Sequence, residues 1–242
     1  WDDHLIATPE EGGWQTVSDS PIAYNNMPAP KELTIDEINQ LTKQFGIAAK
    51  RAESAGFDVI EIHAAHGYLL HQFLSPLSNQ RTDIYGGSLE NRARLLVEIV
   101  ISIRAAIGDD LPLAVRFSAT DWIEGGWTEA DTALVAQWCI DAGADLFDIS
   151  TAGLSTAQKI AVGPGFQVPF AEYVGEKVDA PVAAVGMITT GTQAEEILQK
   201  GIVDVVMIGR AALGDPYWPI RAAKELGAEI DYLPKRYKRA IF

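Results

Sequence analysis

The densest group of side chains that could do chemistry lies within six residues of the sequence. His63, His66 and Tyr68 follow a short apolar run, and each side chain can donate a hydrogen bond. The two histidines could share a metal ion, although no carboxylate follows them at helical spacing. They could instead donate to one substrate oxygen while Tyr68 supplies a proton. They could also be two structural histidines at the start of a loop. The residues alone leave these interpretations open.

Other polar residues lie at the ends of later apolar runs. Arg116 lies within the run 113–117, where a buried charge needs an acidic partner such as Asp121 or an electron-rich ligand edge. Gly186 and the pair Gly209–Arg210 follow the last two runs. Glycine lets a phosphate approach the backbone, and a helix start with an arginine attracts it. We therefore favour a phosphate site over two ordinary turns.

Two charged segments favour structural interpretations. Arg81 and Asp83 stand in the long connection before Ser88, and a salt bridge between them would hold that loop together. The basic run 235–239 favours a solvated tail or a subunit contact. Nucleic-acid binding is disfavoured because the net charge of −14 repels phosphate backbones.

The elements that must position these residues alternate between helices and short apolar strands. Capping-box pairs, Thr34 with Glu37 and Thr192 with Glu195, predict two of the helix starts. The predicted helices cover residues 34–55, 88–107, 128–142, 169–178 and 192–200, and the predicted strands cover residues 57–63, 113–117, 145–150, 182–185 and 203–208. Nearly continuous apolar strands are typical of a parallel sheet that is buried on both faces.

This alternation predicts an α/β fold, either a (β/α)₈ barrel or an open doubly wound sheet. An open dinucleotide-binding sheet would carry G-x-G-x-x-G after its first strand, and the sequence has no such motif. Polar residues at several strand ends favour the barrel. Five strands are visible, so the chain would supply about the last five βα units. We expect one domain over residues 1–242, with an irregular lead-in at 1–33 and βα units over 34–242.

Composition excludes several classes of protein. Hydrophobic residues make up 48% and charged residues 21% of the chain, as in ordinary globular proteins. No apolar run is long enough to cross a membrane. The lone Cys139 excludes a disulfide framework, a cysteine-built zinc site and a cysteine-ligated iron–sulfur cluster. We expect a soluble cytoplasmic protein without a metal site.

Several motifs resemble those of the old yellow enzyme family of FMN-dependent ene-reductases, in the branch of thermophilic-like members and xenobiotic reductases. The motifs are His63–Pro76, Asn79–Arg92, Val185–Ile188 and Ile208–Arg210, in the family's order. The His-x-x-His form indicates that branch. The resemblance covers essentially the whole chain and implies a (β/α)₈ TIM barrel that binds FMN non-covalently, with the visible strands as the fourth to the eighth.

The resemblance also implies roles for single residues. His63 and His66 would contact the flavin and hydrogen-bond the substrate's carbonyl or nitro oxygen, and Tyr68 would be the proton donor. Arg116 would lie beside the flavin pyrimidine, and the phosphate would be held by Gly186, Met187, Gly209 and Arg210. Arg239 would bind substrate, reaching a neighbouring subunit's site in a homo-oligomer. The implied reaction is NAD(P)H-dependent reduction of activated alkenes, namely enones, enals and nitroalkenes, with hydride from flavin N5.

One departure from the family pattern concerns the first three strands, which carry further flavin contacts in the family. The sequence begins after the point where the third strand should end. We therefore expect a second chain or a missing segment to supply the first three βα units. The alternative function is a non-catalytic barrel remnant that serves as a ligand-binding or assembly subunit.

Overall fold

A five-stranded parallel sheet forms the centre of the computed structural model, which describes residues 7–236. The strands are β3 (Ile60–Ala64), β4 (Leu113–Ser118), β5 (Leu146–Ser150), β6 (Val182–Ala184) and β7 (Val205–Val206), paired in chain order. Helices separate them: α1 (Ile35–Ser54) precedes β3, and α2 (Leu69–Leu74) with α3 (Leu89–Ile107), α4 (Glu129–Asp141), α5 (Val168–Gly175) and α6 (Gly191–Leu198) lie between later strands. Two short helices, α7 (Arg210–Gly214) and α8 (Trp218–Glu225), follow β7. The fold is part of a (β/α)₈ barrel, with five of its strands present in this chain.

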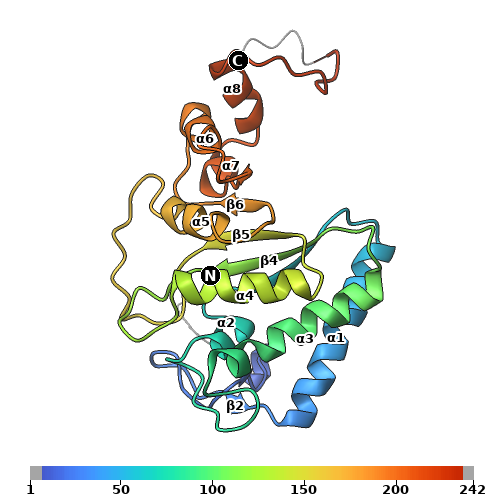
Figure 1. Ribbon diagram of the computed structural model, residues 1–242, viewed down its shortest axis with the longest axis vertical. Coiled ribbons are helices and arrows are strands. Elements are labelled where there is room, and N and C mark those ends of the chain that lie inside the picture. Colours follow the sequence, from blue (N-terminus) through green and yellow to red (C-terminus); the bar gives the residue numbers. More distant parts are fainter. Residues whose placement is uncertain (1–6, 237–242) are drawn as a thin grey trace.

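The two faces of the sheet differ in chemistry because successive strand residues point to opposite sides. On one face, Ile62, Phe117 and Phe147 are fully buried against the helices. Figure 1 shows α3, α4 and α5 following one another along the sheet, with α1 beside α3. The other face carries polar side chains, including the exposed His63 on β3. This second face corresponds to the interior of a closed barrel.

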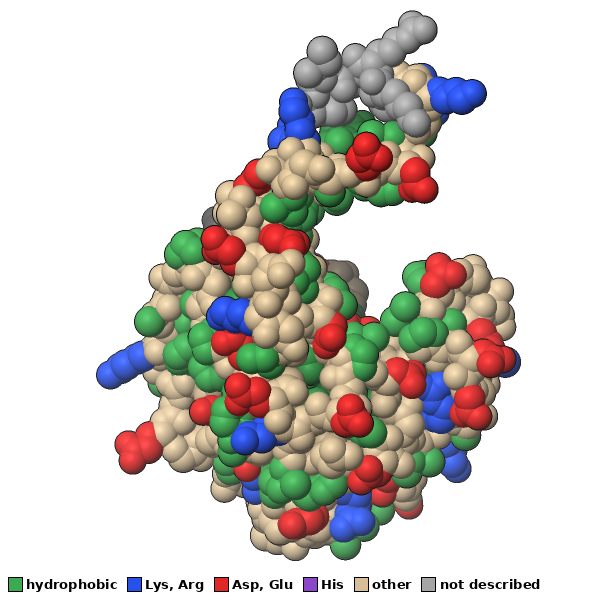
Figure 2. Space-filling model, turned by 45° about the horizontal axis from the view of Figure 1, so that its top comes forward, with side chains coloured by type: hydrophobic (Ala, Val, Ile, Leu, Met, Phe, Trp, Pro, Cys, Tyr) green, Lys and Arg blue, Asp and Glu red, His purple; other side chains and the backbone are tan. Residues whose placement is uncertain are grey.

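Both ends of the sheet are open within the part of the chain that the structure describes. There, β3 pairs with β4 alone and β7 pairs with β6 alone. Figure 2 shows the surface hollowed between the arm that carries the C-terminal helices and the lobe opposite it. No helix within residues 7–236 is long and apolar enough to cross a membrane.

The helix starts show which sequence signals were reliable. Thr34 and Glu37 form the predicted capping box at the start of α1. The predicted box of Thr192 with Glu195 is wrong, because α6 begins two residues earlier with Thr190 as its N-cap. The amide and hydroxyl of Thr192 donate instead to Glu225 of α8. A carboxylate from a distant helix therefore satisfies a helix start that the local pattern assigned to Glu195.

The predicted strand boundaries are too long at two places. The first strand begins at Ile60 rather than at Phe57, whose amide donates back to the Ala52 carbonyl at the end of α1. The last strand contains only Val205 and Val206 instead of residues 203–208. The five predicted helices and five predicted strands nevertheless occur in the predicted order, whereas two short strands in the lead-in and the helices α2, α7 and α8 were not predicted.

The described part of the lead-in, residues 7–33, is mostly irregular but contains a two-stranded parallel pair. β1 (Val17–Ser18) pairs with β2 (Lys31–Glu32). Arg81 fixes this pair to the body by donating to the carbonyls of Asp19, at 2.9 Å, and Leu33, at 2.7 Å. The predicted bridge from Arg81 to Asp83 is present, with two hydrogen bonds between the side chains. The arginine therefore holds both its own loop and the lead-in.

We predict that Arg81→Met lowers the free energy of unfolding by about 2–4 kcal/mol, because two buried carbonyls lose their donor and the partly exposed Asp83 loses its salt bridge. Lys200→Met is the matched control: it removes the partly exposed bridge to Glu172 and should cost less than about 1 kcal/mol. Urea unfolding of both variants measures the difference. Equal effects would contradict the role given to Arg81.

Candidate active site

His63, His66 and Tyr68 are brought together where β3 ends. His63 lies on the polar face of β3. His66 follows the end of the strand by two residues and begins a tight reversal of the chain. Tyr68 is the N-cap of α2. The rings of His63 and His66 lie 5.2 Å apart between centroids, and those of His63 and Tyr68 lie 5.4 Å apart. The Tyr68 side chain is 64% exposed, so its hydroxyl is accessible to a ligand. The three predicted site residues therefore form one cluster.

The reversal depends on left-handed backbone at two successive residues. His66 has φ +59° and Gly67 has φ +74°. A non-glycine residue in this region is uncommon and needs support from its surroundings. The support comes from neighbouring strand ends: the His66 amide donates to Ser118 Oγ at 2.9 Å, and His66 Nε2 lies 2.8 Å from Ser150 Oγ. The ends of β4 and β5 thus hold His66 in place.

Burial and a nearby cation keep both imidazoles neutral at pH 7. Burial, and after it the positive charge of Arg116, lower the pKa of His66 to about 4. The same two causes lower the pKa of His63. A neutral imidazole carries one N–H donor and one acceptor. The His66 tautomer decides which partner donates in the contact with Ser150, because the single proton of the Ser150 hydroxyl also has Gln167 Oε1 within 3.3 Å as an acceptor.

Arg116 pairs with Asp148 rather than with Asp121, the acidic partner suggested by the sequence. Its Nε lies 3.0 Å from Asp148 Oδ2. The sheet register explains the choice, because Arg116 is paired with His63 on one side and with Asp148 on the other. Burial raises the pKa of Asp148. The positive charge of Arg116 lowers it and the nearby Glu61 raises it further, so that the pKa is about 6. The Arg116 side chain remains 28% exposed on the barrel-interior face, so it can also reach a ligand.

The predicted phosphate residues lie at the ends of two adjacent strands. Gly186 and Met187 follow β6 with φ +134° and +52°, and the Met207 amide donates to the Ala184 carbonyl. A Cβ at Gly186 would lie 3.1 Å from the Gln167 backbone nitrogen, so glycine is needed for this close approach. Gly209 precedes α7, and a Cβ there would meet only open space. Arg210 is exposed beside it. Arg239 lies outside the described residues.

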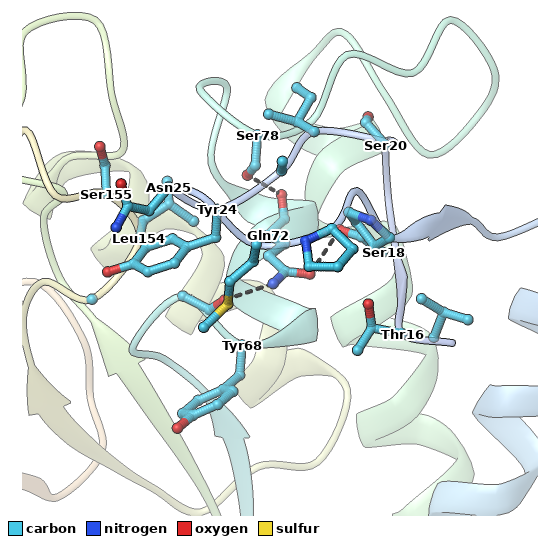
Figure 3. A pocket seen from close by; sticks show the side chains of 18 of the residues that line it. Thr16, Ser18, Ser20, Tyr24, Asn25, Tyr68, Gln72, Ser78, Leu154 and Ser155 are labelled. Carbon is cyan, nitrogen blue, oxygen red and sulfur yellow. Dashed lines mark hydrogen bonds between the residues drawn. The ribbon is translucent and has the colours of Figure 1, made fainter. Parts of the chain in front are cut away.

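A cavity of about 1110 Å³ adjoins Tyr68 and His66. Its wall is built by the lead-in, by α2 and by the segment after β5. Figure 3 shows Gln72 between Tyr24 on one side and Ser18 on the other, with Tyr68 below. The lead-in contributes Trp14, Ile22, Tyr24, Met27 and Pro28 among other side chains.

This cavity wall was not predicted from the sequence. The lead-in has neither helical nor strand periodicity, so no pattern assigned its aromatic residues to a site. Ser118 was missed as well, although its place at a strand end was a usable signal. Among residues 7–236, no three side chains of the metal-binding types gather as a metal site would require.

Comparison with known proteins gives a consistent family. A model described as the NADH:flavin oxidoreductase / NADH oxidase family matches residues 6–229. The chain is 47% identical over 226 residues to an NADPH dehydrogenase of Geobacillus thermodenitrificans, covering 93% of this chain and 65% of that protein. It is 49% identical over 221 residues to an NADPH dehydrogenase of Bacillus subtilis, covering 91% and 64%. The chain thus spans about 65% of the length of the curated relatives it matches.

Solved structures agree in fold. A 2-naphthoyl-CoA reductase in complex with 2-naphthoyl-CoA matches with a TM-score of 0.81 and 32% identity, covering 89% of this chain and 34% of that one. Morphinone reductase in complex with tetrahydroNAD matches with a TM-score of 0.73 and 26% identity, covering 93% and 63%. Both matches extend over nearly all of this chain.

The electrostatics of the histidine pair can be tested by NMR titration. We predict that the His66 ring titrates near pH 4 and that Arg116→Met raises this value, because the substitution removes a repelling charge. The unfolded chain binds the same proton at about pH 6.5, so the folded state loses stability as the pH falls from about 6.5 to about 4. His66→Gln assigns the resonance. A midpoint near 6.5 in the wild-type protein would refute the assignment.

Proposed function

The chain belongs to the NADH:flavin oxidoreductase / NADH oxidase family, and we propose that it carries the catalytic residues of an FMN-dependent enzyme that reduces activated alkenes. Membership of this family implies FMN and NAD(P)H as the cofactors. The observation that carries the proposal is the cluster of two neutral imidazoles and an exposed phenol beside a cavity of about 1110 Å³. The imidazoles of such a cluster can polarise the carbonyl oxygen of an enone, and the phenol can protonate its α-carbon.

The described residues fit a flavin in their donor chemistry. Arg116, partly exposed on the barrel-interior face, can meet the electron-rich edge of the flavin ring. The backbone at Gly209 has open space beside it where a phosphate can approach. The exposed Arg210 next to it can donate charge-assisted hydrogen bonds to that phosphate. Gly186 and Met187 complete the turn at the neighbouring strand end. Bound FMN supplies the hydride, taken from NAD(P)H, that reduces the β-carbon of the alkene.

The histidines act on the substrate oxygen. An enone, enal or nitroalkene gains negative charge on its oxygen as the β-carbon is reduced. Imidazole N–H groups of His63 and His66 donate to that oxygen and bind it more tightly as the charge grows, which lowers the barrier. Because both rings are neutral, they stabilise the charge without a net proton transfer to the oxygen. They also contact the flavin in this proposal.

Tyr68 supplies the proton that completes the reduction. Its ring lies 5.4 Å from the His63 ring between centroids, and the residue is 64% exposed. It can therefore reach the α-carbon of an alkene whose oxygen is held by the histidines. A positioned acid of this kind contributes about 10²–10⁴-fold to a rate.

The sheet needs further strands to close into a barrel. An eight-stranded barrel closes only when strand number, tilt and shear agree. Within the described residues β3 and β7 have one neighbour each, and three more βα units would join them. We propose that these units come from a further segment of the same protein or from a second polypeptide. A homo-oligomer in which Arg239 reaches a neighbouring site is part of the same proposal.

The decisive experiment takes this chain together with the first three βα units, loads the protein with FMN, reduces it with NADPH and mixes it with cyclohexenone under anaerobic conditions. We expect the flavin absorbance to recover as the enone is reduced. A protein that binds no FMN and oxidises no NADPH would favour the non-catalytic ligand-binding or assembly subunit. An FMN protein that the enone fails to reoxidise would refute alkene reduction.

The histidine clamp predicts tight binding of phenols, because a phenolate presents the same charged oxygen as the reacting substrate. Titration with p-hydroxybenzaldehyde should give a long-wavelength charge-transfer band. His63→Ala and His66→Ala should each weaken binding by about 1.5–3 kcal/mol, the scale of a charge-assisted hydrogen bond. Unchanged affinity in both variants would show that the ligand oxygen binds elsewhere.

Tyr68→Phe separates the proton donor from the clamp. We predict that the variant reduces cyclohexenone about 10²–10⁴-fold more slowly while its affinity for p-hydroxybenzaldehyde stays within about threefold. Flavin reoxidation in stopped flow measures the first quantity, and the charge-transfer band measures the second. A rate equal to that of the wild type would remove Tyr68 from the mechanism.

A further inference from the structure

Gly67 lies between His66 and Tyr68. Side chains of α2 hold both of its backbone polar groups, the amide and the carbonyl. The Gly67 amide donates to His71 Nδ1 at 2.9 Å. The Gly67 carbonyl accepts from Gln72 Nε2 at 2.7 Å, and Gln72 Oε1 accepts from Ser18 of the lead-in. His71 has no part in the reaction proposed above.

His71 is fully buried and faces a fully buried carboxylate. Its Nε2 lies 2.9 Å from Asp121 Oδ1, and both side chains have no exposed surface. The other oxygen of Asp121 accepts from Ser75 Oγ at 2.6 Å and from the Trp127 amide at 2.8 Å. Asp121 is therefore fixed from several sides. The two atoms lack the angle of a hydrogen bond, but a negative charge 2.9 Å from Nε2 attracts a proton to that nitrogen and so favours the tautomer that carries it there.

This tautomer is the one that Gly67 requires. With the proton on Nε2, Nδ1 has a free lone pair and can accept the Gly67 amide. A proton on Nδ1 would point at the Gly67 N–H and break the contact. Asp121 thus acts on Gly67 through the His71 ring, much as a carboxylate orients a metal-binding histidine.

The opposite side of the Gly67 peptide is closed by backbone. A Cβ at Gly67 would lie 2.2 Å from the Gly153 carbonyl oxygen, and a Cβ at Gly153 would lie 2.4 Å from His66 backbone atoms. The reversal is therefore confined between the Gly153 backbone and the His71 ring. A change at His71 therefore acts first on the His66–Gly67 peptide, whose N–H it accepts, and through Gly67 on the course of the chain to Tyr68.

We infer that His71 is a positioning residue: its ring, oriented by Asp121, accepts the Gly67 amide and thereby sets the mutual orientation of the His66 imidazole and the Tyr68 phenol. The inference deepens and rests on the proposed function, which assigns those two groups to the substrate. A ring that merely fills space would make the Gly67 contact dispensable.

Two substitutions divide the His71 ring into its two contacts. In His71→Asn the amide Oδ1 takes the place of Nδ1, so the acceptor for Gly67 is kept and the reach to Asp121 is lost. In His71→Gln the amide Nε2 takes the place of the ring Nε2, so the donor to Asp121 is kept and the acceptor for Gly67 is lost. Thermal unfolding and circular dichroism show whether each variant folds.

The first readout needs no cofactor. We expect the Gly67 amide to exchange slowly with D₂O in the wild type and in His71→Asn, and at least about tenfold faster in His71→Gln, because an unpaired amide is open to solvent. The His66 ring resonances should stay in place in His71→Asn and move in His71→Gln. Equal exchange and equal His66 shifts in both variants would overturn the inference.

The second readout is catalytic. A misplaced reacting group can lose up to about 10²-fold in rate, so kcat for cyclohexenone should fall about 10–100-fold in His71→Gln and less than about threefold in His71→Asn. Hydride transfer and FMN content serve as controls for flavin binding. A kcat unchanged in His71→Gln despite faster Gly67 exchange would overturn the positioning role.

The two proposals can fail separately. If the wild-type protein is not reoxidised by the enone, alkene reduction fails, and the Gly67 and His66 signals still decide whether His71 orients the loop. If His71→Gln does not fold, the wild type alone decides. There, a ¹⁵N–¹⁵N coupling across the Gly67–His71 hydrogen bond supports the inference, and a protonated Nδ1 overturns it.

Discussion

The hydrogen-bonded register of the parallel sheet is the constraint on which the candidate site depends. It places His63, Arg116 and Asp148 side by side on three successive strands. The row combines a ring that must stay neutral, a cation that lowers its pKa and an acid that holds the cation. A shift of one residue in any strand would turn its polar side chain toward the helices. The apolar residues that face the helices resist such a shift, so the core protects the chemistry.

The separation in sequence between interacting residues explains which features could be predicted from the sequence. Features determined within a few residues were predicted correctly, as for the Thr34 capping box and the bridge from Arg81 to Asp83. Features that depend on distant residues were not. The sequence suggested Asp121 as the partner of Arg116, and pairing with β5 supplied Asp148 instead. The Thr192 box failed for the same reason, since Glu225 reaches it from another helix.

The site follows a similar division. The strand-end cluster of His63, His66 and Tyr68 was apparent from residue types, because the carboxyl ends of parallel strands meet at one edge. The hydroxyls that hold His66 come from other strands, and the Ser118 contact spans 52 residues of sequence. The cavity wall offered no periodic pattern at all. Residue types and spacing therefore identified the cluster, whereas the contacts that hold it required the folded chain.

The anchoring of the lead-in has a consequence for how the site can be altered. Ser18, Asp19 and Ser20 are tied to the body at one end and the Leu33 carbonyl is tied to Arg81 at the other, so residues 21–30 span two fixed points. Side chains within it, such as Ile22 and Tyr24, are nearly half exposed and lie outside the core. Such a loop can be exchanged or lengthened at small energetic cost. It is a natural place to graft new specificity, since His63, His66 and Tyr68 stand on β3 and at the start of α2 rather than on residues 21–30.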